Sequence, residues 1–328
     1  MIAEEMRAGV PAAAVPVGGR RRAGALSLAG AGLLLVGLAV LAIDTERFLT
    51  LDNVRAILSS ASIVGIAALG ATAVMLAGGQ VSLATATLAS VTAMIFLALL
   101  GAGLVPAIAG TLAAGALAYA VLGWLVGVFA VNPIVLTVGA GSLLTGLTVA
   151  ITGGDQVTPA GGGFSTLNDR ILTLPVSVWT FFALALVLHV VLTRTAVGQR
   201  ISLVGESRPT AIAAGLPVGA IVTGAFAIGG ALTAVAGMFL GAVNTNASLE
   251  VGGNLTFDAI AAVLVGGTAI AGGSGSALRT LSGALVVAAI SDLLVLRGYA
   301  TGTQTCIKGL LVLLVVLGVH LRRTGAGR

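Results

Sequence analysis

Long apolar runs separated by short polar segments make up most of this chain. The runs fall at about 25–43, 54–77, 82–100, 104–129, 134–152, 175–193, 218–243, 257–271, 277–296 and 303–320. About 20 apolar helical residues cross the hydrocarbon core of a bilayer, so most of these runs are long enough to span it. The pattern predicts an all-α, polytopic membrane protein with about ten transmembrane or half-membrane helices.

Composition supports the same fold class. Of 328 residues, 58% are hydrophobic and only 8% are charged, whereas a soluble domain carries about 25% charged residues. A surface with so few charges needs lipid rather than water as its solvent. The lipid bilayer is therefore the first partner that we expect.

The arginines predict the orientation of the chain. If the N-terminus lies in the cytoplasm, ten spans return the C-terminus there, and eleven arginines fall on the cytoplasmic side against four outside. The cytoplasmic set is Arg7, Arg20, Arg21, Arg22, Arg194, Arg200, Arg208, Arg279, Arg322, Arg323 and Arg328, and the outer set is Arg47, Arg55, Arg170 and Arg297. Since these basic clusters flank apolar runs, the net charge of +5 does not indicate nucleic-acid binding.

The domain organisation follows from the same pattern. Residues 1–24 are rich in Ala, Pro and Gly with a basic end, and we interpret them as a disordered cytoplasmic tail. The run 25–43 is either an uncleaved anchor or a signal peptide. We expect a single membrane domain over 25–321, with a cytoplasmic loop at 194–217, and a short cytoplasmic tail at 322–328.

Glycine pairs interrupt the apolar pattern at three places. AGGQVS (77–82) and AGGSGS (271–276) each follow one run and open the next, and such matched breaks indicate a transport site in repeat-built transporters. We therefore assign Gly78, Gly79, Gly272 and Gly273 to the path or its hinges. Gly266 and Gly267 fit either a hinge or close helix packing. Polar candidates for lining the path are Gln80, Ser82, Asn132, Asn244 and Ser276.

Three charged residues lie inside apolar runs, namely Asp258, Asp292 and Lys308. Each would cost about 2.5–3.5 kcal/mol at the centre of a membrane helix. Asp292 and Lys308 sit at similar depths on either side of a short turn, so we predict that they form a structural ion pair. The alternative is a proton relay in a proton-coupled secondary transporter.

The cytoplasmic loop 194–217 predicts a short helix. Pro209 suits a first turn, Thr210 to Ala214 can form the body, and Gly215 with Pro217 ends it. Such a helix could receive force from a separate motor protein. A solvated connecting loop is the alternative.

Several chemistries have no support in the sequence. There is no G-x-x-x-x-G-K-[ST] phosphate loop, and the two histidines, His189 and His320, lie on separate runs. A single cysteine, Cys306, allows no intramolecular disulfide. We predict no metal site, no cofactor bound by this chain and no enzymatic activity.

Three segments carry a resemblance to a known family. VGESRPTAIAAGLPVG (204–219), DAIAAVLVGGTAIAGGSGSALRTLSGALV (258–286) and QTCIKGLLVLL (304–314) resemble the membrane permease of ribose-type, sugar-carrying ABC importers, and NPIVLTVGAGSLLTGL (132–147) matches less strictly. The resemblance departs at Gly78-Gly79-Gln80-Val81-Ser82, where family members usually carry an aspartate. It also departs at Ser207-Arg208, where asparagine is common.

The resemblance implies an assembly and a division of roles. It implies a homodimer of permeases in the bacterial inner membrane, two cytoplasmic ATPases that hold ATP and Mg²⁺, and an external solute-binding protein. The ATPase-coupling residues would be Gly205, Glu206, Ser207, Arg208, Pro209, Thr210, Ala211, Ala214 and Gly215. Asp258 would lie near the outer mouth where the binding protein docks, within a negative rim that favours a basic partner surface.

Overall fold

Eleven helices and one small hairpin make up the part of the chain that the structure describes. The structure is a computed structural model that describes residues 48–325 except 79–80, 160, 162–166 and 168. Its helices are α2 (Leu51–Leu76), α3 (Thr85–Leu99), α4 (Leu104–Phe129), α5 (Pro133–Thr152), α7 (Val176–Arg194), α8 (Ala196–Glu206), α9 (Arg208–Ala213), α10 (Val218–Asn244), α11 (Leu255–Val265), α12 (Ala277–Leu296) and α13 (Thr301–Gly325). A 3-10 turn, η2 (Leu100–Ala102), extends α3.

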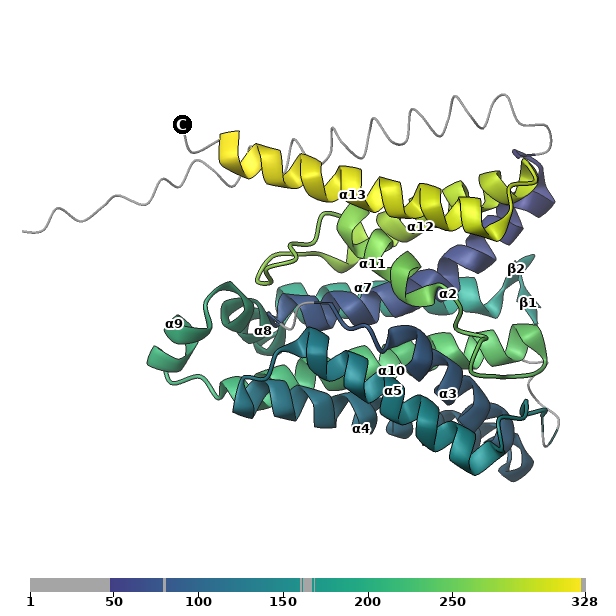
Figure 1. Ribbon diagram of the computed structural model, residues 1–328, viewed down its shortest axis with the longest axis horizontal. Helices are drawn as coiled ribbons and strands as arrows, with labels where there is room; N and C mark the ends of the chain where they lie inside the picture. Colours follow the sequence, from purple (N-terminus) through teal and green to yellow (C-terminus); the bar gives the residue numbers. More distant parts are fainter. Residues whose placement is uncertain (1–47, 79–80, 160, 162–166, 168, 326–328) are drawn as a thin grey trace, which may run out of the picture.

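The long helices run between two distinct ends of the molecule (Figure 1). The short helices α8 and α9 form one end, which we call the α9 end. At the other, the β end, β1 (Arg170–Ile171) pairs antiparallel with β2 (Leu174–Pro175). A bridge between Val157 and Ala247 joins the segments that follow α5 and α10.

Helix α2 lies at the centre of the bundle. In its most apolar stretch 72% of the residues are buried, against 17% for α5. Its glycines allow this burial because they let neighbours approach closely. Gly65 lies against the ring of Phe181, and a methyl group at Gly70 would lie 2.7 Å from the carbonyl oxygen of Gly229 on α10.

Helices α4 and α10 pack on each other through glycines along their length. A methyl group at Gly115 would lie 2.7 Å from the carbonyl oxygen of Gly230, and one at Gly127 would lie 2.8 Å from that of Gly219. Lipid is as apolar as these side chains, so close van der Waals contact between backbones supplies much of the attraction. These two helices therefore form one closely packed block.

The predicted all-α membrane fold is confirmed, with differences in detail. By length and composition, seven of the described helices can cross a membrane, and α4 has the predicted bounds. The run predicted at 257–271 forms a helix only to Val265, because Gly267 takes a left-handed conformation (φ +77°). Helix α13 continues to Gly325, beyond the predicted domain end at 321. The tail 1–24 and the run 25–43 lie outside the described residues.

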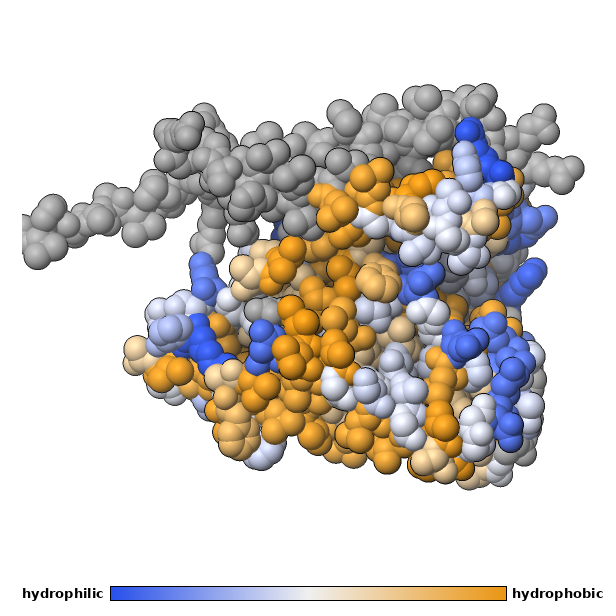
Figure 2. Space-filling view, viewed as in Figure 1, coloured by the Kyte–Doolittle hydropathy of each residue, from blue (hydrophilic) through white to orange (hydrophobic). Residues whose placement is uncertain are grey.

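The surface matches a bilayer environment. Figure 2 shows an apolar belt across the middle of the molecule, with hydrophilic residues gathered toward the α9 end and the β end. Exposed large apolar side chains on α4 and α5 include Val105, Leu117, Val135 and Leu143. A belt of this kind suits the hydrocarbon core, with the polar ends in the headgroup regions.

Candidate functional site

A shallow groove lies between α3 and α5. Its volume is about 500 Å³, and it is lined by Leu83, Thr87, Thr137, Val138, Gly141, Ser142, Thr145 and Gly146. Four of these residues carry hydroxyl groups, and the lining contributed by the described residues carries no charge. A paler area interrupts the apolar belt over α3 and α5 in Figure 2.

Local sequence places these hydroxyls on one side of α5. Asn132 caps the helix by accepting a hydrogen bond from the Ile134 amide at 2.9 Å, with Pro133 in the first turn. From this start, Thr137, Gly141 and Thr145 follow at intervals of four and share one face. A methyl group at Gly141 would lie 3.7 Å from the Thr87 hydroxyl oxygen, whereas one at Gly146 would meet nothing within 4 Å, so α5 packs against α3 near Gly141 and is open at Gly146.

One groove hydroxyl is held within the protein, and another is available to a solute. Thr137 is buried and accepts a hydrogen bond from the Leu83 amide at 3.1 Å, which ties α5 to the segment before α3. Ser142 is exposed and donates to the Val138 carbonyl at 3.2 Å, which leaves its oxygen lone pairs available. The arrangement suits weak hydrogen bonds with a passing neutral solute.

Ser82 does not line this groove. Its side chain is buried, and its oxygen lies 2.7 Å from the hydroxyl oxygen of Tyr119 on α4. Tyr119 thus holds this hydroxyl in the packed interior of the chain, and contact of Ser82 with solute stays a prediction. Gly79 and Gln80 lie outside the described residues.

The other predicted polar residues are scattered. Asn132 caps α5 near the α9 end, whereas Asn244 is exposed at the last residue of α10, where its amide donates to the Leu240 carbonyl at 2.9 Å. Ser276 precedes α12, and its carbonyl accepts from the Thr280 amide. The structure does not bring these three residues together in one site, and their contact with solute remains a prediction.

The two glycine-broken turns meet each other and the last turn of α8. A methyl group at Gly272 would lie 2.8 Å from the Gly78 Cα and 3.0 Å from the Gly205 carbonyl oxygen. One at Gly205 would overlap the carbonyl oxygen of Leu76, and the amide of Gly273 donates to that same oxygen at 3.1 Å. We call Gly78, Gly205, Gly272 and Gly273 the glycine cluster. The sequence predicted hinges at three of these positions and an ATPase contact at Gly205, without indicating that they touch.

Gly266 packs closely against α12. A methyl group there would lie 2.5 Å from the carbonyl oxygen of Arg279, whereas the adjacent Gly267 makes the left-handed turn that ends α11. The sequence left open whether these two glycines serve close helix packing or a hinge. Gly266 packs against α12, and Gly267 forms the turn after α11.

The short helix predicted in the loop 194–217 is present as α9. Ser207 caps it, with its side-chain oxygen 3.4 Å from the Thr210 amide, and Pro209 lies in its first turn. Gly215 follows with φ +74° and ends the segment. Helix α8 precedes α9 and was not predicted. The structure does not test which residues of α9 contact an ATPase.

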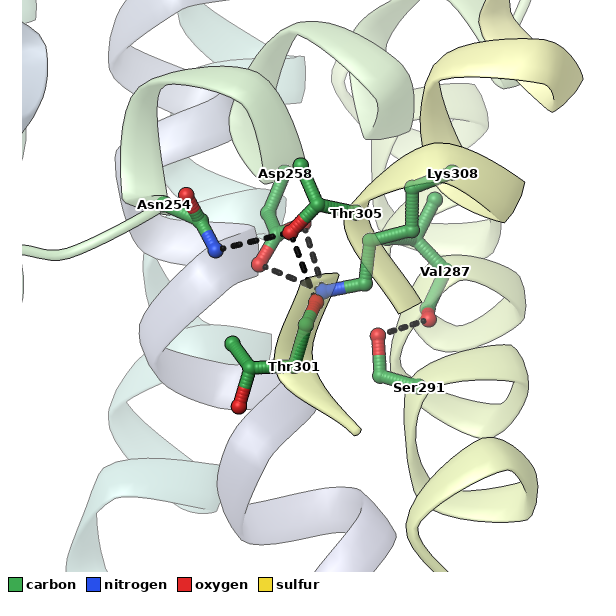
Figure 3. Close-up of polar contacts among 7 residues, drawn as sticks. All are labelled: Asn254, Asp258, Val287, Ser291, Thr301, Thr305 and Lys308. Atoms are coloured by element: carbon green, nitrogen blue, oxygen red, sulfur yellow. Dashed lines mark hydrogen bonds and ion pairs between the residues drawn. The ribbon is translucent and has the colours of Figure 1, made fainter. Parts of the chain in front are cut away.

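The predicted ion pair between Asp292 and Lys308 is wrong. Lys308 on α13 binds Asp258 on α11 instead, with its ammonium nitrogen 2.9 and 3.1 Å from the two carboxylate oxygens (Figure 3). Asp292 accepts a hydrogen bond from the side-chain amide of Asn53 at 2.7 Å. The helix directly across the turn is α13, but its lysine faces α11, which the order of the segments along the chain does not reveal.

This pairing also bears on the role assigned to Asp258. The Asp258 side chain is 15% exposed, and that of Lys308 is 16% exposed. Most of the carboxylate surface is thus occupied within the chain, and docking of a binding protein at Asp258 stays a prediction.

The groove residues on α5 were missed by the sequence analysis. Their signal is the spacing of Thr137, Gly141 and Thr145 within an apolar run, beside Ser142 and Gly146. The same small-residue spacing is typical of helix packing seams in membranes, and Thr137 and Gly141 do pack against α3, so the spacing alone does not reveal the groove beside them.

Comparisons with known proteins agree on one family. The family described as "Branched-chain amino acid transport system / permease component" matches residues 53–318. The "Ribose import permease protein RbsC" of Escherichia coli K12 is 31% identical over 294 residues, covering 87% of this chain and 90% of that protein. The RbsC of Bacillus subtilis 168 is 28% identical, covering 87% and 89%.

A further relative has a different named solute. The "Autoinducer 2 import system permease protein LsrD" of Yersinia enterocolitica is 31% identical over 303 residues, covering 89% of this chain and 90% of that protein. No solved structure matches the chain.

The family fixes the class and location of the protein. Importers of this class combine a permease in the bacterial inner membrane with ATPase and solute-binding partners. The match extends from α2 into α13 and so includes the groove, the glycine cluster and α9. The chain therefore belongs to this family of permease components and is a multi-pass membrane subunit of an ATP-binding-cassette importer.

Proposed function

We propose that this permease carries a neutral, polyhydroxylated solute, a sugar or a similar small molecule, along the groove between α3 and α5. The observation that carries the proposal is the lining of the groove, which offers hydroxyl groups and, among the described residues, no charge. An amino acid is a zwitterion, and moving its two charges past such a wall would require ionic partners. A sugar needs only hydrogen bonds, which Thr87, Thr145 and Ser142 can make, whereas the buried Thr137 is already bonded within the chain.

In this proposal the α9 end faces the cytoplasm, and α9 docks onto the ATPase. Its small exposed tip suits insertion into a partner surface, since Ile212 is 59% exposed while Ala211 is buried. ATP hydrolysis takes place on the partner, and this chain performs no catalysis. Movement of α9 would then switch the groove between outward and inward openings.

A second copy of the chain completes the path in this proposal. Helix α5 has only 17% of its most apolar stretch buried, and the face that carries Ser142 and Gly146 is exposed. Polar groups facing lipid are costly, so a homodimer that places two such faces opposite each other would remove that cost and enclose a polar path.

The test is transport by the full importer in proteoliposomes. The chain is reconstituted with its ATPase and its binding protein, and ATP-driven uptake of labelled ribose is compared with that of labelled leucine. Uptake of ribose without leucine is expected, and the opposite result would overturn the proposal. Uptake by the chain alone, driven by a proton gradient, would instead support a secondary transporter.

A matched pair of variants tests the groove itself. Thr145→Val removes one groove hydroxyl at nearly constant volume, and we expect uptake to fall about tenfold through the loss of one hydrogen bond to the solute. Thr180→Val makes the same change on α7, where the hydroxyl donates to the Val176 carbonyl at 3.0 Å outside the groove, and should leave uptake unchanged. Equal effects of the two variants would exclude the groove as the path.

A further inference from the structure

Arg208, the first residue of α9, makes two hydrogen bonds to the last turn of α4. One terminal nitrogen of its guanidinium group donates to the Val126 carbonyl at 3.1 Å, and the other donates to the Gly127 carbonyl at 2.5 Å. The contact joins segments that lie about eighty residues apart along the chain. It directs the half-buried guanidinium group toward α4.

The end of a helix is a favourable place for this side chain. The last four carbonyls of a helix lack amide partners, and the aligned peptide dipoles make that end negative. Helix α4 ends at Phe129, where Ala130 takes a left-handed conformation (φ 54°). The planar guanidinium fork can satisfy two of these carbonyls at once.

Apolar packing supports the same attachment. Ala211 of α9 is buried at 3% exposure in one cluster with Val126 of α4 and Val218 and Val222 of α10. Helix α9 is therefore held to the block of α4 and α10 by a charged contact and an apolar contact one turn apart.

The attachment point is also the start of the groove helix. Three residues after Phe129, Asn132 caps α5, which carries Thr137, Ser142 and Thr145. A displacement of α9 that is transmitted to the end of α4 therefore reaches the first turn of α5 through a link of three residues.

We propose that Arg208 is a positioning residue that fixes α9 to the end of α4, so that movement of α9 displaces the turn between α4 and α5. The inference rests on the proposed docking of α9 onto the ATPase. It adds a second role for α9, which is to pass movement on to the membrane helices α4 and α5.

The first experiment needs no ATPase. In a Cys306→Ser background, a nitroxide label on Ile212→Cys reports the mobility of α9 by electron paramagnetic resonance. Arg208→Gln should increase label mobility at least about threefold, because both charged hydrogen bonds are lost. Arg208→Lys, which keeps the charge and one donor position, should give an intermediate value. Arg200→Gln changes an exposed arginine on α8 and is the matched control, with no change expected.

The second experiment measures solute transported per ATP hydrolysed in the reconstituted importer. Arg208→Gln should keep the ATPase attached and hydrolysing ATP while uptake per ATP falls about tenfold, with partial rescue by Arg208→Lys. Unchanged mobility, or increased mobility with an unchanged ratio, would overturn the role of Arg208. Loss of ATPase attachment in Arg208→Gln would also overturn it, because the arginine would then act at the docking surface.

The two proposals can fail separately. If substitutions at the exposed Ile212 leave ATPase attachment intact, docking through α9 is wrong, whatever the mobility experiment shows. If those substitutions release the ATPase while Arg208→Gln leaves the transport ratio unchanged, docking stands and the positioning role fails.

Discussion

Lys308 on α13 and Asp258 on α11 form a bidentate ion pair, with distances of 2.9 and 3.1 Å to the two carboxylate oxygens. Figure 3 shows Asn254 and Thr305 beside the pair, and the Asn254 amide donates to the Thr305 hydroxyl at 3.4 Å. The pair fastens α13 to α11, the short helix that leads into the glycine-broken turn.

Removing one partner of this pair should destabilise the protein more than removing both. Lys308→Met or Asp258→Asn leaves one charge without its partner in a low-dielectric setting, at a cost of about 3 kcal/mol. The double variant leaves no charge and should recover much of the stability, as measured by thermal unfolding in detergent.

The exposed pair of Asp52 and Arg55 provides the control for this experiment. The Asp52 side chain is 94% exposed, so Asp52→Asn should leave the unfolding temperature nearly unchanged. Equal losses in the single and double variants of Asp258 and Lys308 would show that the pair contributes nothing as a pair.

Gly205→Ala should destabilise the packing at the α9 end of the molecule. The added methyl group would overlap the Leu76 carbonyl oxygen and lie 2.7 Å from the Gly273 amide nitrogen. Overpacking against backbone costs about 1–3 kcal/mol, so the unfolding temperature and transport should both fall.

Gly224→Ala on α10 is the matched control for that change. Nothing lies within 4 Å of the methyl group it would add, and alanine favours a helix over glycine by about 0.5–1 kcal/mol. This variant should be neutral or slightly more stable. A loss of stability as large as that of Gly205→Ala would contradict the assigned packing.

The buried hydroxyls of Ser82 and Tyr119 should behave as a coupled pair. Tyr119→Phe leaves the Ser82 hydroxyl buried without its partner, at a cost of about 1–3 kcal/mol. Ser82→Ala removes the hydrogen bond that the Tyr119 hydroxyl shares with Ser82. The double variant should cost less than the sum of the two, by thermal unfolding. Tyr299→Phe, at a residue that is 44% exposed, should change stability by less than about 0.5 kcal/mol. Simple additivity would mean that the two hydroxyls do not interact.

The sequence predicted the helices well and their lateral contacts poorly. The length of an apolar run determines a membrane helix almost by itself, which explains the agreement for α4. Helix α9 was predicted because a proline lies in its first turn and a glycine follows its end. The partner of Lys308 depends on how α11 and α13 are rotated about their axes, which periodicity in uniformly apolar helices does not encode. The groove was missed because threonine and glycine at intervals of four indicate a packed seam and an open wall equally well.

The glycine cluster has a mechanical consequence. Side chains can usually absorb a small displacement between neighbouring segments by changing rotamer, but at Gly78, Gly205 and Gly272 backbone meets backbone. No rotamer adjustment is available there, so a shift of any one segment must displace the other two or separate them. The last turn of α8 is therefore joined stiffly to both glycine-broken turns, and these positions should remain glycine in natural relatives, because any other residue adds atoms.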